Sequence, residues 1–245
     1  MTEKRRLVVI GGCGGIGRSL ISRATSEGWQ VTVLDLQPSL DRHPLPESVS
    51  GVPIDLKDEQ SIVSAFEGLG PMEGLVNLAG FMSPHQPLEQ THVEEFDEVM
   101  SGNFRGAFIA SKLALPLLRQ GTDASMVHFV SGLATHVRPG YGPYGAAKAA
   151  MINMVKTLAL EAAPAVRINA VGPAAVDTAF LRGGTGRSSE NKTPHLNIDA
   201  YVAMTPLSRM AVPDDVVGPT MFLLGTDSSF MTGQVLWVNG GGYMP

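Results

Sequence analysis

The chain has 245 residues, of which 44% are hydrophobic, and its 18 basic and 23 acidic residues give a formal net charge of −5. This length and composition suffice for one α/β domain around a buried sheet, and the acidic balance argues against a nucleic-acid partner. The single cysteine excludes an internal disulfide, and no apolar run resembles a membrane span or a signal peptide, so we expect a cytoplasmic protein without a membrane partner.

A glycine-rich loop follows the first predicted strand. Residues 7–10 form a short apolar run that is typical of a buried parallel strand, and a helix-like stretch follows at residues 18–27. Strand, glycine loop and helix form the arrangement in which backbone N–H groups and a helix N-terminus hold a pyrophosphate. Two registers fit this pattern, Gly12-x-Gly14-x-x-Gly17 and Gly11-x-x-x-Gly15-x-Gly17. The sequence therefore predicts a nucleotide-binding site.

Asp35 bears on which nucleotide is bound. It ends the second predicted strand, residues 31–34, and its spacing from Gly17 suits a βαβ unit that places a carboxylate on the adenosine ribose. Such a carboxylate accepts both ribose hydroxyls of NAD but repels the 2′-phosphate of NADP. Leu36 follows, and no Arg or Lys lies in the loop before Gly15. We therefore expect NAD in preference to NADP.

Tyr144 and Lys148 place a phenol and an ammonium group one helical turn apart, on the same helix face. A free tyrosine has a pKa of about 10. An ammonium about 4 Å away stabilises phenolate by about 4 kcal/mol at an effective dielectric constant near 20. At about 1.4 kcal/mol per pKa unit, this lowers the tyrosine pKa by about three units. The pair therefore predicts an acid–base tyrosine, although such a pair alone is more often a solvated helix face.

Together, the glycine loop and the Tyr-x-x-x-Lys pair resemble the short-chain dehydrogenase/reductase family, and the resemblance covers essentially the whole chain. The family signature Gly-x-x-x-Gly-x-Gly selects the register of Gly11, Gly15 and Gly17, with Ile10 where the family usually has Thr. The resemblance implies a single domain over residues 1–245. Its expected fold is an α/β, Rossmann-like, doubly wound parallel sheet of about seven strands with helices on both faces.

The resemblance assigns four catalytic residues. Tyr144 would exchange the hydroxyl proton of the substrate, and Ser131, at the end of an apolar strand, would hydrogen-bond the substrate oxygen as charge develops there. Lys148 would lower the Tyr144 pKa and hold the nicotinamide ribose. Asn103 would keep an ordered water that connects Lys148 to solvent. Taken singly, Ser131 is also explained as a backbone cap and Asn103 as a side chain that bends a helix.

Other segments match the cofactor-binding pattern of the family. Residues 77–80 read Asn-Leu-Ala-Gly where the family has Asn-Asn-Ala-Gly, and Ala174 replaces a Gly in the segment 173–178. Residues 231–241 are similar to the family's final strand. No metal site is expected. The implied cofactor-binding residues are Gly11, Gly15, Ile16, Gly17, Asp35, Leu36, Asp55, Leu56, Asn77, Ala79, Gly80, Tyr144, Lys148, Pro173, Val176 and Thr178.

The segment 181–205 is longer than a connection between packed elements usually is when it has no function, and it follows shortly after Thr178. We predict a mobile flap that covers the substrate and excludes water. Its cations, Arg182, Arg187, Lys192 and His195, suit an acidic substrate, although a solvated flap is the commoner explanation.

Residues just beyond the matched motifs are expected to form the substrate pocket, and their side chains suit a mid-sized, partly apolar substrate with an aromatic or alicyclic body. His136 and His85 are candidates for polar contacts, although loop histidines are more often simply at the surface. Tyr141 is not a rival catalyst, because position 145 is Gly rather than Lys. The predicted pocket residues are Phe81, Met82, Thr135, His136 and Tyr141, together with parts of the segment 181–205.

The predicted function is NAD-dependent hydride transfer between nicotinamide and a small-molecule secondary alcohol or ketone, with Tyr144 as the acid/base. One alternative is an NADP-linked carbonyl or 3-oxoacyl reductase, against which Asp35 argues. An alternative from a different class is a non-catalytic NAD-sensing regulator, against which the complete catalytic set argues.

A homotetramer is expected, mainly because members of the family commonly assemble as tetramers. The helix that follows Tyr144 is apolar on more than one side, and residues 235–238 are similarly apolar. Burial of both sides within a monomer is the alternative explanation.

Overall fold

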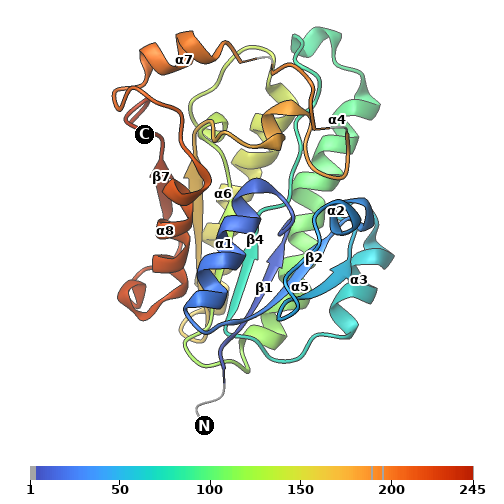
Figure 1. Cartoon of the computed structure of the whole chain (residues 1–245), viewed down its shortest axis with the longest axis vertical. Coiled ribbons are helices and arrows are strands. Elements are labelled where there is room, and N and C mark those ends of the chain that lie inside the picture. Colours follow the sequence, from blue (N-terminus) through green and yellow to red (C-terminus); the bar gives the residue numbers. More distant parts are fainter. Residues whose placement is uncertain (1–3, 189, 195, 245) are drawn as a thin grey trace.

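Seven parallel strands form one sheet in the computed structural model, which describes residues 4–188, 190–194 and 196–244, and their order is β3-β2-β1-β4-β5-β6-β7 (Figure 1). This confirms the predicted Rossmann-like sheet. The strands are β1 (Arg6–Ile10), β2 (Gln30–Asp35), β3 (Ser50–Pro53), β4 (Gly74–Asn77), β5 (Ser125–Phe129), β6 (Arg167–Pro173) and β7 (Val235–Val238).

The order in which the chain adds strands to the sheet changes side at β1. From β1 the strands proceed to β2 and β3 on one side, and the chain then returns to place β4 on the other side. Ile10, the last residue of β1, lies opposite Leu34 of β2 and Asn77 of β4, so the strands end side by side. In open α/β sheets, ligands bind outside the carboxyl ends of the strands at such a switch point.

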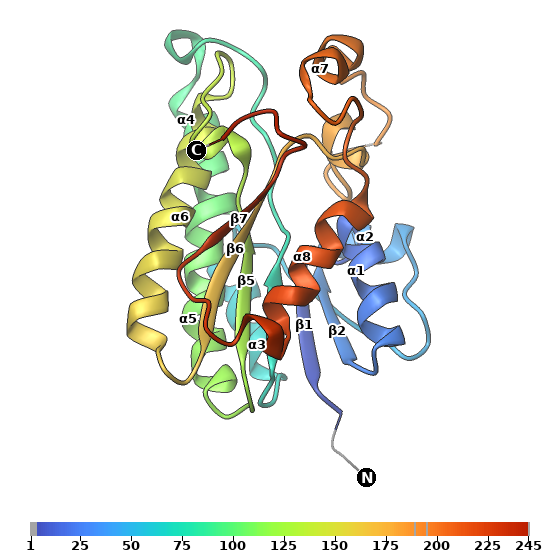
Figure 2. The same cartoon turned by 90° about the vertical axis from the view of Figure 1, so that its left-hand side faces the viewer.

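Helices cover both faces of the sheet, as Figure 2 shows with the sheet seen nearly edge-on. On one face lie α3 (Glu59–Glu67), α5 (Gly106–Leu118) and α6 (Gly142–Ala162), and on the other lie α1 (Gly15–Ser26) and α8 (Pro213–Leu224). The side chains of β1 alternate between the two cores, as a strand with a period of two requires. The doubly wound arrangement thus follows from strands that are apolar on both faces.

The chain also forms shorter helical elements, of which η5 (Thr226–Ser228) lies at the amino end of β6, where Arg167 bonds to Ser228. No helix in the described part of the chain is both long and apolar enough to cross a bilayer. The shorter elements are α2 (Gln37–Arg42), η1 (Leu88–Gln90), α4 (Val93–Met100), η2 (Ser101–Arg105), η3 (Gly132–Ala134), η4 (Ala179–Arg182), α7 (Ile198–Met204) and η5 (Thr226–Ser228).

Candidate active site

A cavity of about 470 Å³ lies at the carboxyl ends of the strands. The glycine loop, the ends of β2 and β5, the segment after β6 and residues of the predicted flap all contribute to its wall. Asp55, Asn77 and Asn103 lie outside its lining. The predicted site residues that line it are Gly11, Gly15, Ile16, Gly17, Asp35, Leu36, Leu56, Ala79, Gly80, Ser131, Tyr144, Lys148, Pro173, Val176 and Thr178.

Close backbone packing shapes the glycine loop. Gly11 has a φ of +80°, and a Cβ there would lie 2.8 Å from the backbone nitrogen of Ala79. A Cβ on Gly17 would lie 2.4 Å from the carbonyl oxygen of Gly12, whereas one on Gly14 would meet nothing closer than 3.5 Å. Gly14 is the N-cap residue of α1 and has no side chain to cap the helix, so the helix N-terminus remains available to an anion. The loop therefore has the form of a pyrophosphate cradle.

Asp35 sits at the end of β2 and is held by the loop itself. Its Oδ2 accepts a hydrogen bond of 2.8 Å from the N–H of Cys13, and its Oδ1 accepts one of 2.8 Å from the N–H of Leu36. Burial raises the pKa of Asp35, and these two backbone donors act against the rise. Burial, with a contribution from Asp35, also raises the pKa of Cys13 to about 12, so this cysteine remains a thiol that fills space beneath the loop.

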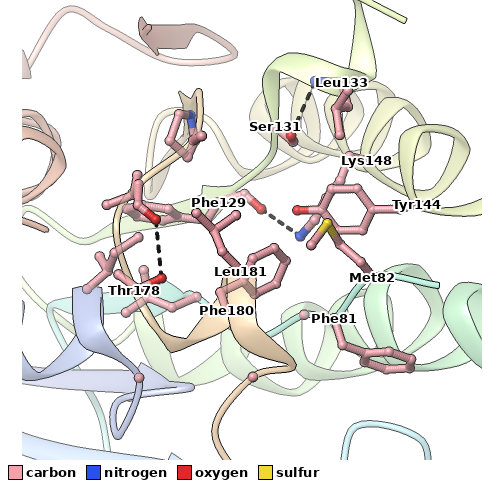
Figure 3. A pocket seen from close by; sticks show the side chains of 18 of the residues that line it. Phe81, Met82, Phe129, Ser131, Leu133, Tyr144, Lys148, Thr178, Phe180 and Leu181 are labelled. Atoms are coloured by element: carbon pink, nitrogen blue, oxygen red, sulfur yellow. Dashed lines mark hydrogen bonds between the residues drawn. The ribbon is translucent and has the colours of Figure 1, made fainter. Parts of the chain in front are cut away.

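Tyr144 and Lys148 project from α6 toward Ser131, which follows β5 (Figure 3). Only 6% of Tyr144 and 2% of Lys148 are exposed. The Nζ of Lys148 donates a hydrogen bond of 3.0 Å to the carbonyl oxygen of Phe129 and lies 5.6 Å from the centroid of the Tyr144 ring. The Ser131 hydroxyl accepts a bond of 3.2 Å from the N–H of Leu133, so it caps η3 as well as facing the cavity. The three side chains meet at one end of the cavity.

Burial governs the protonation of this pair. It raises the pKa of Tyr144 above its ordinary value, with the Ser131 hydroxyl acting in the opposite direction, and it lowers the pKa of Lys148 to about 7. The expectation that Lys148 brings the Tyr144 pKa toward neutrality is therefore wrong for this arrangement. The spacing of the two residues does not reveal the hydration that both groups lose when they are buried, and this loss disfavours the charged form of each.

Asn103 lies in a π-helical turn between α4 and α5 and is fully buried. Its Nδ2 donates to the carbonyl oxygens of Val99 and Phe81 at 2.9 and 3.0 Å, and its Oδ1 accepts from the N–H of Phe81 at 3.2 Å. A Cβ on Gly80 would lie 2.6 Å from Asn103 Oδ1 and 3.2 Å from Lys148 Nζ. Asn103 thus lies beside Lys148 while its amide bonds to the backbone. Its role in holding a water stays a prediction.

His128 is a buried neighbour of the site that the sequence analysis did not consider. It lies on β5 with no exposed surface, its Nε2 is 3.1 Å from Ser111 Oγ, and its Nδ1 has no hydrogen-bond partner in the described part of the chain. Burial, and secondarily the charge of Lys148, lower the pKa of His128 to about 4. The sequence feature that could have indicated this buried histidine is its position within the mostly apolar strand β5.

We expect His128→Gln to lose less stability in acid than the wild-type protein. The folded pKa of about 4 lies below the ordinary 6.5, so the unfolded chain takes up the proton first as the pH falls. The resulting destabilisation grows below pH 6.5 and reaches about 2 kcal/mol near pH 5. Urea unfolding near pH 7 and near pH 5 measures the loss in each protein, and equal losses would contradict the assignment.

The predicted flap lies across the site and is partly helical, because α7 occupies residues 198–204. The Arg187 guanidinium lies 4.1 Å from the Phe81 ring centroid and 3.6 Å from a carboxylate oxygen of Asp55, and Arg42 on α2 pairs with Glu190 at 2.8 Å. Asp55 therefore faces a flap cation. His195 lies outside the described residues.

The substrate end of the cavity includes four of the five predicted pocket residues, Phe81, Met82, His136 and Tyr141, but not Thr135. His85 also lines the cavity. Leu181, Tyr201 and Met204 of the flap line the cavity, as expected. No local pattern in the sequence identified four further lining residues, which are Leu133 in η3, Arg138 before α6, Phe180 in η4 and Tyr243 in the C-terminal tail.

Comparison with known proteins supplies the family. A family model described as Enoyl-(Acyl carrier protein) reductase matches residues 11–243. The 4-formylbenzenesulfonate dehydrogenase TsaC1/TsaC2 of Comamonas testosteroni is 34% identical over 98% of both chains. The chain belongs to the short-chain dehydrogenase/reductase family. As a member of this family it is an oxidoreductase, which confirms the predicted reaction class.

Two further short-chain dehydrogenase/reductase relatives differ in the cofactor that their descriptions name. An NADPH-dependent aldehyde reductase-like protein from the chloroplast of Arabidopsis thaliana is 30% identical, over 97% of this chain and 93% of its own length. The structure of a 3-ketoacyl-(acyl-carrier-protein) reductase from Brucella melitensis in complex with NADH superposes with a TM-score of 0.87, at 26% identity and over 99% of both chains.

Proposed function

We propose that this protein is an NAD-dependent dehydrogenase that interconverts a secondary alcohol and its ketone. The observation that carries the proposal is that one cavity contains both the nucleotide cradle and the Ser131, Tyr144 and Lys148 side chains. A nucleotide-binding loop without catalytic side chains beside it would suit a regulator that senses NAD. A tyrosine–lysine pair without a nucleotide-binding loop beside it would suit a solvated helix face. Their convergence favours an enzyme.

The cavity wall suits NAD along its length. The uncapped N-terminus of α1 would receive the pyrophosphate, Asp35 the adenosine ribose, and Lys148 the nicotinamide ribose. Val176 and Thr178 line the cavity where the carboxamide would lie, and a Cβ on Gly15 would come within 2.7 Å of the Thr178 methyl group. The bound nicotinamide supplies the hydride acceptor or donor.

Tyr144 would move the proton. In reduction its phenol donates to the oxygen that becomes an alcohol, while the Ser131 hydroxyl stabilises the charge that develops on that oxygen. Because burial holds the phenol in its protonated form, reduction starts from the form that is present at neutral pH. Oxidation needs that proton to be removed first, so we expect it to accelerate as the pH rises.

The preference for NAD over NADP rests on Asp35, and we expect Asp35→Ser to reverse it. Removing the carboxylate takes away charged hydrogen bonds to the ribose and the repulsion of a 2′-phosphate, so kcat/KM for NAD should fall by about 10- to 100-fold while that for NADP rises. Asp41→Ser, a change at an exposed position on α2, is the matched control. A wild-type enzyme that prefers NADP would refute the assignment and revive the carbonyl-reductase alternative.

Turnover on a panel of secondary alcohols, hydroxy acids, cyclic diols and aromatic carbonyl compounds tests the function itself, with NAD or NADH and with NADP or NADPH. We expect turnover that depends on Tyr144. Tight NADH binding without turnover on any compound would favour the regulator instead. The relative from Comamonas, described as a 4-formylbenzenesulfonate dehydrogenase, is the reason that aromatic carbonyl compounds belong in the panel.

A cytoplasmic homotetramer remains our proposed form of the protein, with residues 181–205 as a mobile flap. Phe108 on α5 and Leu160 on α6 are 50% and 82% exposed, and burial of such side chains between copies would stabilise an assembly. Sedimentation at micromolar concentration should therefore show a tetramer. A monomer would contradict the proposal.

A further inference from the structure

Basic side chains gather on one wall of the cavity, at its substrate end. His85, His136 and Arg138 line this wall together with the hydroxyl-bearing Tyr141. Among the described residues, the one carboxylate that lines the cavity is Asp35, which belongs to the cofactor end. Arg138 therefore gives this wall a positive charge, and no carboxylate among the described lining residues at the substrate end neutralises it.

Arg138 differs from Arg182 and Arg187, two arginines of the segment after β6, of which only Arg187 lines the cavity. Arg187 on the flap is neutralised by Asp55, and Arg182 is neutralised by Asp177 at 2.7 Å. Arg138 forms no ion pair with a carboxylate within the described ranges, and its Nη2 lies 3.4 Å from Nε2 of His136. In this contact Arg138 donates and Nε2 of His136 accepts, so an anion that replaces the contact would take the Arg138 donors and, with His136 in its Nε2–H tautomer, a donor from the ring as well.

The C-terminal tail fixes the position of His136. Its ring stacks on Tyr243 with centroids 5.2 Å apart and an interplanar angle of 7°. Tyr243 is itself held by a 2.7 Å hydrogen bond from Asn239 Nδ2 to its carbonyl oxygen and by an edge contact with Trp237. Because the His136 ring is already held in place, it loses little conformational freedom when a ligand binds. This favours a preformed binding site over a mobile surface histidine.

Arg138 lies close enough to Tyr141 to act on it electrostatically. Burial raises the pKa of Tyr141, and the charge of Arg138 acts against the rise, so the field of Arg138 reaches this phenol. Tyr141 lies one helical turn before Tyr144 at the start of α6. The lining also includes the apolar side chains of Met82, Leu133 and Phe180, which pack against the cluster that contains Tyr144.

We infer that Arg138 and His136 bind a carboxylate or sulfonate group of the substrate, at the end remote from the carbon that reacts at Tyr144. The substrate class is then an aryl ketone, or the matching alcohol, that carries an acid group across the ring. The apolar stretch of the pocket would cover the ring, and the exposed guanidinium would meet the acid group at the rim. This inference rests on the proposed function, because both concern the same cavity.

Paired ketones test the inference by kinetics. The probes are 4-acetylbenzoate and 4-acetylbenzenesulfonate, each compared with the neutral 4-acetylbenzamide. In the wild-type protein the acids should have the higher kcat/KM, and Arg138→Gln should lower the ratio of acid to amide by about 10- to 100-fold, mainly through KM. Arg138→Lys should restore part of the ratio, and Arg119→Gln, at the exposed end of α5, should leave it unchanged. An unchanged ratio in Arg138→Gln would overturn the inference.

Binding of benzoate and benzenesulfonate, measured by calorimetry in the presence of NADH, separates this inference from the proposed function, because neither compound has a reacting carbonyl. We expect the dissociation constant of at least one to rise by about 10- to 100-fold in Arg138→Gln. Equal binding by both proteins would overturn the inference even if ketones are reduced. Arg138-dependent binding without turnover of any ketone would instead refute the proposed function and leave the anion site standing.

Discussion

Tyr144→Phe should lose about 100- to 10,000-fold in kcat while it remains folded and still binds NADH, because the change removes only the phenolic proton that the reaction exchanges. The ring is 6% exposed and packs with Val99 and Ala147, so Phe preserves the apolar contacts. Rates of ketone reduction give kcat, and the fluorescence of bound NADH gives the dissociation constant of the cofactor.

Tyr141→Phe is the matched control for this prediction. Tyr141 also lines the cavity, but Gly145 rather than a lysine follows it by one helical turn, and the Tyr141 hydroxyl has no part in the proposed proton transfer. This variant should retain catalysis. If Tyr144→Phe keeps a kcat close to that of wild type, or if Tyr141→Phe loses as much, the assignment of the acid/base is wrong.

Lys148→Met should abolish turnover and yet stabilise the fold at neutral pH. The pKa of Lys148 falls from 10.5 to about 7 on folding, so below pH 10.5 the unfolded chain binds more protons than the folded one. The resulting destabilisation is complete below pH 7 and disappears as the pH rises to 10.5. At pH 7 it amounts to about 4 kcal/mol, and the unpaired Phe129 carbonyl of the variant offsets about 1–3 kcal/mol.

Denaturant unfolding of both proteins between about pH 6.5 and pH 9.5 measures this effect, within a range where the buried Tyr144 remains protonated. We expect Lys148→Met to be more stable by about 1–3 kcal/mol near pH 7, and the gain to shrink as the pH rises. A variant less stable than wild type at pH 7, or a gain that does not change with pH, would show that Lys148 is not buried at a cost. A more stable Lys148→Met variant would show that the catalytic lysine lowers the stability of the folded protein, as is common for active-site residues.

Local spacing allowed the cofactor end of the site to be predicted from the sequence. Gly11, Gly17 and Asp35 lie within one βαβ unit, and Tyr144 and Lys148 lie within one helical turn, so their relations follow from chain geometry. All five line one cavity. Asp55 shows the limit of this reasoning, because its pairing with Arg187 depends on how residues 181–205 fold back over the sheet.

The substrate end could not be predicted to the same depth. Tyr243 reaches the cavity from the C-terminal tail and Phe180 reaches it from η4, and no periodicity connects these segments with the residues around Tyr144. The protonation of Tyr144 depends on burial, which requires the packed structure rather than the spacing of two residues. The sequence does not distinguish Arg138 from other loop cations, because its position on the cavity wall and the absence of an acidic partner among the described residues depend on the packed structure.

Deuterium transfer is the most direct measurement of the central claim. The protein is incubated with NAD and 4-(1-hydroxyethyl)benzoate that carries deuterium on its carbinol carbon, and the NADH produced is analysed by mass spectrometry and NMR. We predict one deuterium at C4 of the nicotinamide ring, with only trace product from Tyr144→Phe. NADH that lacks deuterium, or no NADH from this alcohol or any labelled secondary alcohol that binds, would contradict the account.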